Sequence, residues 1–487
     1  MNVDTGTIVG VALLALLAIA VLALWFKFGP RDFLLMAAVC FPVVWFSRLD
    51  LLPISAFGQH VPTHWFVLIG VLVLIGPLGD RTTRAAIGPA FWRIAVPLIA
   101  LALIMFVSIL ANGRDPQDVA VGLRAMLFAL LPFFAAWVVV RAVRFDEDSL
   151  RRLVVMIYAI AGVTAGLSVL SALAPQLFAG VLADPTSSDP DSARGFTTLG
   201  GANTTGNVLA CVACVASGCV LAKYRRALSV GVLVLCFLGV LTTLARAALL
   251  AFVVSQLYIF LRIAKGFGQR VAMFAVIAVF LLAPAAYRLA KDYEYSFERF
   301  FIWQEGSADA RRIAMEAAVQ YGLSHPLLGG GWGLVYPYGR AALGTRDLPN
   351  VWYVGTMATP VVKPHTLYGV VLAETGVVGL VLLLWFLWRI WGALRPPDAR
   401  RDPRGNGLVV GFRASFLCVA MIALFQDDLF LLSKLAYVLY LTVLPGILAS
   451  AYSRWGANTP SLLSAKQPGA LAIQVQAAPP LQSLTIR

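Results

Sequence analysis

The sequence has little charge for its length. Of its 487 residues only 13% are Asp, Glu, Lys or Arg, whereas 60% are hydrophobic and the mean hydropathy is +0.83. Soluble domains carry about a quarter charged residues, so this composition excludes a soluble globular chain. The net charge of +14 does not indicate a nucleic-acid partner, because the cations are scattered among links between apolar runs. The anionic cytoplasmic leaflet accounts for them there.

Histidine and cysteine are also scarce. There are four histidines and six cysteines, every cysteine lies inside an apolar run, and no disulfide framework is visible. Cys211, Cys214 and Cys219 share one segment with Ala, Val, Ser and Gly, which favours small-residue helix packing over a metal site. His60 and His64 have the spacing of a metal-binding pair but lack a third ligand nearby. We therefore expect no metal and no cofactor.

Long apolar runs are abundant instead. A helix needs about 20 apolar residues to cross a bilayer, and the chain predicts an all-α polytopic membrane protein with 12–13 transmembrane helices. The first run lacks the basic start and the cleavage site of a signal peptide, so we expect it to be retained. The candidate spans are 7–26, 32–47, 65–80, 94–111, 119–140, 153–173, 206–222, 227–244, 246–263, 271–287, 366–388, 408–426 and 429–450.

Lys and Arg gather in every second link between these spans. Cytoplasmic links carry such an excess, so the alternation predicts a bacterial inner (cytoplasmic) membrane protein whose N-terminus and remaining links face the periplasm. The clusters are Lys27 and Arg31; Arg81, Arg84 and Arg93; Arg141, Arg144, Arg151 and Arg152; Lys223, Arg225 and Arg226; Arg262, Lys265 and Arg270; Arg389, Arg395, Arg400, Arg401 and Arg404; and Arg454.

This topology divides the chain into four parts. N-terminal helices occupy 1–287, a large periplasmic loop 288–364, C-terminal helices 365–453, and a cytoplasmic tail 454–487. The loop is far longer than a connecting turn, and such loops are usually functional; within it, Ala308–Gly322 is predicted to be helical. The tail is rich in Pro, Ala, Ser and Gln, a composition typical of disorder.

A group of arginines departs from the charge pattern, because its members lie at or near the predicted outer face. They are Arg124, Arg194, Arg246, Arg288, Arg311 and Arg312. Arg246 stands at a predicted helix start, and a cation at that depth normally has a partner in a cavity. The free N–H groups at a helix start and the paired N–H groups of a guanidinium both bind phosphate oxygens. The position of Arg246 therefore favours a diphosphate as its ligand. The alternative is that Arg246 snorkels or pairs with Asp427 or Asp428.

His365 follows the large loop in Val-Val-Lys-Pro-His-Thr-Leu-Tyr-Gly. We expect Pro364 in the first turn of the next helix and His365 at its start, where the helix dipole disfavours imidazolium. A neutral ring there could accept a proton near pH 7; a capping or packing role is the alternative. His325, before Pro-Leu-Leu-Gly-Gly-Gly, is expected to mark a tight turn.

Four stretches of the chain together resemble the bacterial O-antigen ligase and polymerase superfamily. Arg194–Gly206 resembles the outer-loop segment of that family, and Leu241–Leu250 resembles its Ser-Arg-Gly helix start, with Ala245 and Ala247 in place of Ser and Gly. These two motifs are the less specific pair.

The other two motifs lie in and after the large loop. Arg311–Gly333 resembles an Arg…Trp…Pro-x-x-Gly-x-Gly signature in which Met315 replaces Trp, a register that selects Arg311 over Arg312. Pro364–Leu380 resembles a His-Asn-x-Tyr/Phe…Glu-x-Gly-x-x-Gly-Leu run in which Thr366 replaces Asn.

The resemblance implies a GT-C-like membrane glycosyltransferase. It would move a glycan from undecaprenyl diphosphate to an acceptor hydroxyl at the periplasmic face, in a metal-independent inverting displacement, during lipopolysaccharide or surface polysaccharide assembly. His365 would be the general base. The diphosphate would be held by Arg246, Arg311, Arg194 and Arg312, with Glu374 and Arg124 in support.

The sequence leaves open which acceptor receives the glycan. A ligase uses lipid A–core, and the single dominant outer loop slightly favours that assignment. A polymerase of O-antigen or exopolysaccharide uses another carrier-linked repeat unit. A lipid-carrier flippase or polysaccharide exporter is less favoured, because the cations that depart from the charge pattern crowd the outer ends of the helices. A structural membrane subunit is the remaining alternative.

Overall fold

The computed structural model describes residues 29–43, 55–56, 59–60, 63–174, 195, 197–199, 201–263, 315–316, 318–334, 366–398, 402–426, 428–430 and 434–458, besides single positions between 266 and 278. The predicted spans 7–26 and, for the most part, 271–287 lie outside the described residues. So do most of the large loop and the chain after Asn458.

Within these residues, nine helical segments are long and apolar enough to cross a membrane, which confirms the all-α polytopic class. They are α3 Arg81–Asn112, α4 Pro116–Ala142, α5 Glu147–Leu173, α7 Ala202–Leu221, α8 Arg226–Thr243, α9 Arg246–Ile263, α13 Leu367–Ala393, α14 Pro403–Ile422 and the stretch Lys434–Trp455, which joins α15 Lys434–Val443 to α16 Pro445–Asn458.

The described elements that remain are short. A helix covers 29–43, and α2 Thr63–Ile75 runs into a 3-10 turn, η2 Gly76–Leu78. The strands β1 Ser55–Ala56 and β2 Gln59–His60 form an antiparallel pair, and η5 Asp428–Phe430 precedes α15.

Two predicted boundaries at the C-terminal end are wrong. The predicted span 429–450 comprises η5, α15 and part of α16, and Pro445, which has no N–H to continue the helical ladder, separates α15 from α16. The tail does not begin at 454, since α16 continues to Asn458. The rings of Tyr452 and Trp455 pack edge-on against Phe145, at 5.6 and 5.5 Å between centroids, and extend the helix beyond its apolar stretch.

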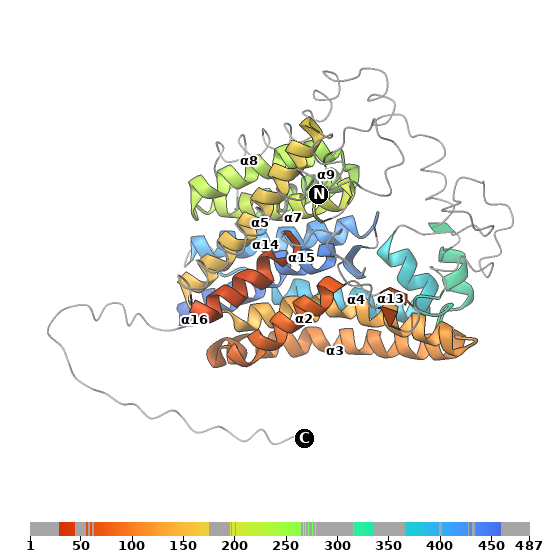
Figure 1. Ribbon diagram of the computed structural model, residues 1–487. Helices are drawn as coiled ribbons and strands as arrows, with labels where there is room; N and C mark the ends of the chain where they lie inside the picture. Colours follow the sequence, from red (N-terminus) through yellow and green to blue (C-terminus); the bar gives the residue numbers. More distant parts are fainter. Residues whose placement is uncertain are drawn as a thin grey trace, which may run out of the picture.

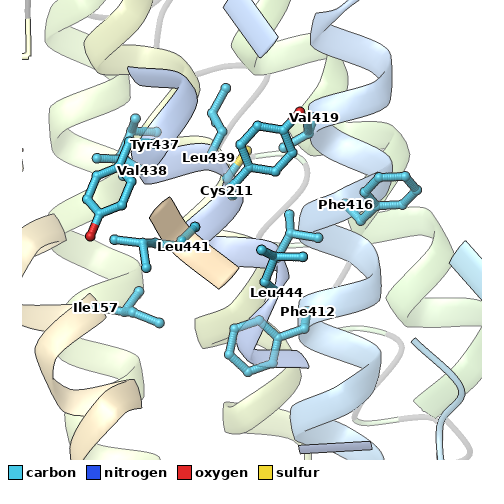
Figure 2. Close-up of a cluster of buried hydrophobic side chains, with 14 of the residues drawn as sticks. Ile157, Cys211, Phe412, Phe416, Val419, Tyr437, Val438, Leu439, Leu441 and Leu444 are labelled. Carbon is cyan, nitrogen blue, oxygen red and sulfur yellow. The ribbon is translucent and has the colours of Figure 1, made fainter. Parts of the chain in front are cut away.

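Two segments form the centre of the bundle. The apolar windows of α7 and of Lys434–Trp455 are 83% and 94% buried, whereas no other candidate span exceeds 67%. In Figure 1, α7, α8 and α9 lie on one side of α14 and α15, and α2, α3 and α4 lie on the other. Figure 2 shows Tyr437 and Leu441 of α15, and Leu444 directly after it, in one buried cluster with Ile157 of α5 and Phe412 of α14. The Tyr437 hydroxyl donates to the Ala38 carbonyl at 2.8 Å.

Small residues bring α7 and α14 into close contact. A Cβ added at Gly407 would lie 1.9 Å from Cβ of Ala222, and one added at Gly411 would lie 2.8 Å from the carbonyl oxygen of Val215. Such approach is typical of helices in membranes, where dispersion contacts replace the hydrophobic drive. The neighbouring thiols, including those of Cys211, Cys214 and Cys219, are buried and free. The expected small-residue packing is therefore confirmed.

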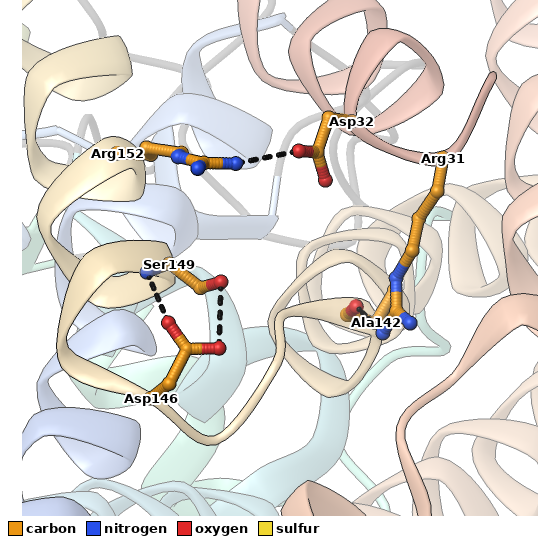
Figure 3. A network of polar contacts seen from close by, with 6 residues as sticks. All are labelled: Arg31, Asp32, Ala142, Asp146, Ser149 and Arg152. Atoms are coloured by element: carbon orange, nitrogen blue, oxygen red, sulfur yellow. Dashed lines mark hydrogen bonds and ion pairs between the residues drawn. The ribbon is translucent and has the colours of Figure 1, made fainter. Parts of the chain in front are cut away.

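Within the described residues, the chain near Arg31 and the link between α4 and α5, which both carry Lys and Arg clusters, meet at one end of the bundle, called here the basic end. Arg152 pairs with Asp32 at 2.6 Å, and Arg31 donates to the Ala142 carbonyl at 2.8 Å, as Figure 3 shows. Asp146 caps α5 by accepting from the Ser149 N–H at 2.7 Å. These contacts join the chain near 31 to the link between α4 and α5, as the predicted alternation requires.

Asp80 caps α3 at the same end. Burial by itself would raise the pKa of this carboxyl, but hydrogen bonds from the Thr83 N–H and hydroxyl and the charge of Arg31 outweigh it and lower the pKa. Thr83 Oγ1 also contacts the Val143 carbonyl oxygen, at 2.7 Å. The start of α3 is thereby fixed against the link that follows α4.

Candidate functional site

A break in α13 lies at the end of the bundle opposite the basic end. Gly376 has φ +72 and ψ −170 inside the helix, which leaves neighbouring carbonyls without their helical partners. Residues 325–334, called here the Gly-rich turn, fill that break. The Gly330 and Gly331 N–H groups donate to the Ala373 and Glu374 carbonyls at 2.9 and 3.1 Å, and the Val378 N–H donates to the Pro326 carbonyl at 3.3 Å.

Glycine is required on both sides of this contact. Gly329 has φ +60, and a Cβ there would lie 2.5 Å from the carbonyl carbon of Glu374. A Cβ at Gly376 would lie 2.5 Å from the Pro326 carbonyl oxygen. Only glycine adopts these backbone conformations at low cost and allows two main chains to approach so closely. The turn expected at His325 is confirmed, because the Gly329 N–H donates to its carbonyl at 3.0 Å.

Side chains also join the Gly-rich turn to the break in α13 and its neighbours. The Glu374 carboxylate is buried and accepts from the Gly333 N–H at 2.9 Å. Ser108 of α3 contacts the Glu374 carbonyl oxygen through its hydroxyl at 2.7 Å. Trp332 is buried with its ring edge-on to Phe430 of η5, at 6.2 Å between centroids. The Gly-rich turn is therefore held against α3, α13 and η5 together.

The start of α13 is fixed by the end of α14. The Leu367 N–H donates to the Ala423 carbonyl at 2.9 Å, and the Thr366 hydroxyl donates to the same oxygen at 3.2 Å. Because α13 begins at Leu367 with Thr366 as its N-cap, Pro364 is not in the first helical turn, and that expectation is wrong. His365 directly precedes the cap and lies outside the described residues.

A second group of polar residues surrounds the first turns of α7. The ammonium of buried Lys434 donates to the Thr198 carbonyl at 3.2 Å, and the hydroxyls of Thr197 and Thr205 are 2.9 Å apart. The Asn207 amide donates to the Gln426 side chain. Residues 197–199 are thereby held over the start of α7 by Lys434 of α15 and by Thr205, and the link that follows α14 contacts α7 at Asn207.

Lys434 was absent from the predicted site. The sequence signal was available, because a lysine inside the apolar run 429–450 is costly at membrane depth and is by default a candidate functional residue. The predicted site gives the outer-face role to arginine alone and omits Lys434, which the structure places against residues 197–199.

Arg246 is the first residue of α9, as predicted, and its side chain is exposed. The helix start packs on α7, since a Cβ at Gly206 would lie 2.7 Å from both Cβ of Ala245 and the Thr243 hydroxyl. Leu244 makes the tight corner between α8 and α9 with φ +55, a conformation uncommon for a residue other than glycine. Arg246 and Lys434 therefore both lie beside the first turns of α7.

The remaining predicted residues divide between described and undescribed parts of the chain. The Arg124 guanidinium of α4 lies over the Phe128 ring, 5.4 Å from its centroid. Arg194, Arg311, Arg312 and the side chain of Asp428 lie outside the described residues, as does Asp427. No group of three His, Cys, Asp or Glu side chains within the described ranges could hold a metal ion. His60 lies in β2 and His64 in α2.

Comparison with known proteins gives one family. Residues 231–384 match the family model described as O-Antigen ligase. The matched range begins within α8, contains Arg246, the Gly-rich turn and the break at Gly376, and ends within α13. A search of curated proteins found no match.

Proposed function

We propose that this chain, whose residues 231–384 match the O-Antigen ligase family model, transfers a glycan from undecaprenyl diphosphate to an acceptor hydroxyl. The transfer would take place at the periplasmic face of the inner membrane. The observation that carries this proposal is the binding of the Gly-rich turn to the break in α13. Two distant parts of the family motif are joined there by main-chain hydrogen bonds, at the end of the bundle where α9 begins with Arg246.

The arrangement suits a diphosphate donor at the start of α9. The first N–H groups of a helix have no helical acceptor and favour an anion, and a guanidinium can hold two phosphate oxygens at once. Lys434, buried beside residues 197–199, adds a second cation near the first turns of α7. These groups would stabilise the negative charge that develops on the departing diphosphate.

The reaction we propose is one inverting displacement. The acceptor oxygen attacks the anomeric carbon, the bond from that carbon to the diphosphate oxygen breaks, and His365 takes the hydroxyl proton. Undecaprenyl diphosphate leaves with the electron pair. Thr366 and Leu367, which directly follow His365 in the sequence, are both fixed to the Ala423 carbonyl. Positioning of this kind supplies a large part of the rate enhancement in a two-substrate reaction.

A test on purified protein uses Arg246→Ala, with Arg226→Ala as its matched control. Arg226 is also an exposed first residue of a helix, α8, but lies at the basic end. We expect Arg246→Ala to lower turnover by about 10²-fold or more, the usual effect of removing one group that stabilises developing charge. Arg246→Lys should recover little, because a point charge lacks the bidentate fork. Equal activity of Arg246→Ala and Arg226→Ala would contradict the proposed donor site.

The acceptor is tested in a deletion strain. As a ligase, which we favour, the protein would transfer finished glycan to lipid A–core, and its loss would leave polymerised glycan on the carrier. As a polymerase, its loss would leave single repeat units. Glycan profiling by gel and mass spectrometry distinguishes the two, and an unchanged profile would contradict both.

A further inference from the structure

Arginines and aromatic rings form a cluster between α9, α13 and α14 toward the basic end, away from the proposed glycan-transfer site. The Arg413 guanidinium lies over the Trp391 ring at 3.9 Å from its centroid. That ring contacts Tyr258 edge-on at 5.4 Å, and the Arg262 guanidinium lies 5.9 Å from the Tyr258 centroid. Arg395 acts on Arg413 through its charge. We call Arg262, Arg395, Arg413, Tyr258 and Trp391 the arginine–aromatic cluster.

Two buried polar atoms of this cluster lack a hydrogen-bond partner within the described part of the chain. Arg413 Nε and the Tyr258 hydroxyl are buried, and neither has a hydrogen-bond partner there. The titratable groups around Arg413 are the Tyr258 hydroxyl and two further cations, Arg262 and Arg395, and none of the three is a carboxylate. A buried donor without a partner costs about 1–3 kcal/mol, and more when it is charged. An anion between these groups would remove that cost.

The position of Arg413 indicates where the anion comes from. It is the eleventh of the twenty residues of α14 and the sixth of the apolar run that begins at Leu408, so its backbone lies inside the apolar span. A cation at such depth is rare and marks a binding site or pathway by default. The flank of the cluster is apolar and exposed, with Leu257, Leu261 and Trp388 at 49%, 73% and 66% exposure. A ligand can therefore enter sideways from the lipid phase.

We propose that the arginine–aromatic cluster binds the phosphate of an anionic phospholipid of the cytoplasmic leaflet. The aromatic rings occupy the faces of two guanidinium groups and leave their N–H edges for phosphate oxygens. The Tyr258 hydroxyl supplies a further donor, and Arg395 adds charge. The acyl chains lie along Leu257, Leu261 and Trp388. Basic pockets between transmembrane helices on the cytoplasmic side recognise anionic headgroups by this chemistry.

The experiment measures lipid retention by native mass spectrometry. Delipidated full-length protein is titrated with phosphatidylglycerol, or with phosphatidylcholine of the same acyl chains. We expect wild type to retain phosphatidylglycerol preferentially, and Arg413→Gln to weaken its apparent affinity by about fivefold or more, the worth of one basic residue near an anionic headgroup. Arg262→Gln tests the same site at an exposed helix end, in case Arg413→Gln does not fold. Arg226→Gln, an equal charge change elsewhere at the basic end, should retain the lipid as wild type does.

Three results would overturn the assignment. Equal retention of the two lipids would exclude recognition of the headgroup. If Arg226→Gln weakened phosphatidylglycerol retention as much as Arg413→Gln, the effect would come from overall charge and not from this cluster. Release of bound phosphatidylglycerol by millimolar inorganic phosphate would identify a site for a free anion instead of a lipid.

Discussion

Replacement of Gly376 by Ala tests the central contact of the fold. An L-residue at φ +72 and ψ −170 costs about 1–3 kcal/mol, because that region is almost restricted to glycine. The new Cβ would also lie 2.5 Å from the Pro326 carbonyl oxygen and 2.7 Å from that of His325. Both contacts are to main chain, which cannot rotate away as a side chain would. The Gly-rich turn must therefore leave the break in α13.

Gly392→Ala is the matched control, since it lies in the same helix and an added Cβ there has nothing within 4 Å. In a helix interior Ala is favoured over Gly by about 0.5–1 kcal/mol, so this variant should melt at or slightly above the wild-type temperature. Gly376→Ala should melt several degrees below it, in detergent-solubilised protein followed by scanning fluorimetry.

Hydrogen–deuterium exchange locates the effect. The N–H groups of Gly330, Gly331 and Gly333 donate to Ala373 and Glu374, so Gly376→Ala should speed their exchange and leave the centre of α7 unchanged. Because Gly329 and Gly376 serve one contact, Gly329→Ala combined with Gly376→Ala should cost less than the sum of the two. Wild-type stability and exchange in Gly376→Ala would refute the reasoning.

Further predictions address the site and its surroundings. Transfer from carrier-linked glycan should continue in excess EDTA, and loss of activity that Mg²⁺, Mn²⁺ or Zn²⁺ restores would contradict the metal-independent displacement. Lys434→Met should lower stability by about 1–3 kcal/mol, because it leaves the Thr198 carbonyl without its donor; an unchanged melting temperature would contradict that role. Asp80→Ala should cost about 1 kcal/mol, the usual worth of an N-cap, and Asp80→Asn, which keeps an accepting oxygen, should cost less.

The helices and the basic end could be predicted from the sequence, because both depend on local composition. Hydropathy gave the spans, and the positions of Lys and Arg assigned the links that Arg31, Asp32 and Arg152 join in the structure. The broken C-terminal span was missed, although Pro445 was visible, because apolar residues continue on both sides of it.

The contacts between distant segments could not be predicted. Gly376 stands in an apolar run, and nothing local distinguishes it from Gly392, whose surroundings are open. Its role depends on the Gly-rich turn some fifty residues earlier. The resemblance identified both segments but not their hydrogen bonds, and it gave Glu374 only a supporting role. The contact of Lys434 with the Thr198 carbonyl could not be predicted for the same reason, since the two residues lie 236 positions apart along the chain.

The turnover of His365→Gln across pH 5 to 9 tests the proposed mechanism most directly. A general base is lost on protonation, so wild-type turnover should fall as the pH drops through the imidazole pKa. His365→Gln can hydrogen-bond but cannot accept the proton, and it should lose about 10²-fold or more in turnover while still binding donor. A wild-type rate that rises toward acid, as a cationic histidine holding diphosphate would give, or near-normal turnover in His365→Gln would contradict the account.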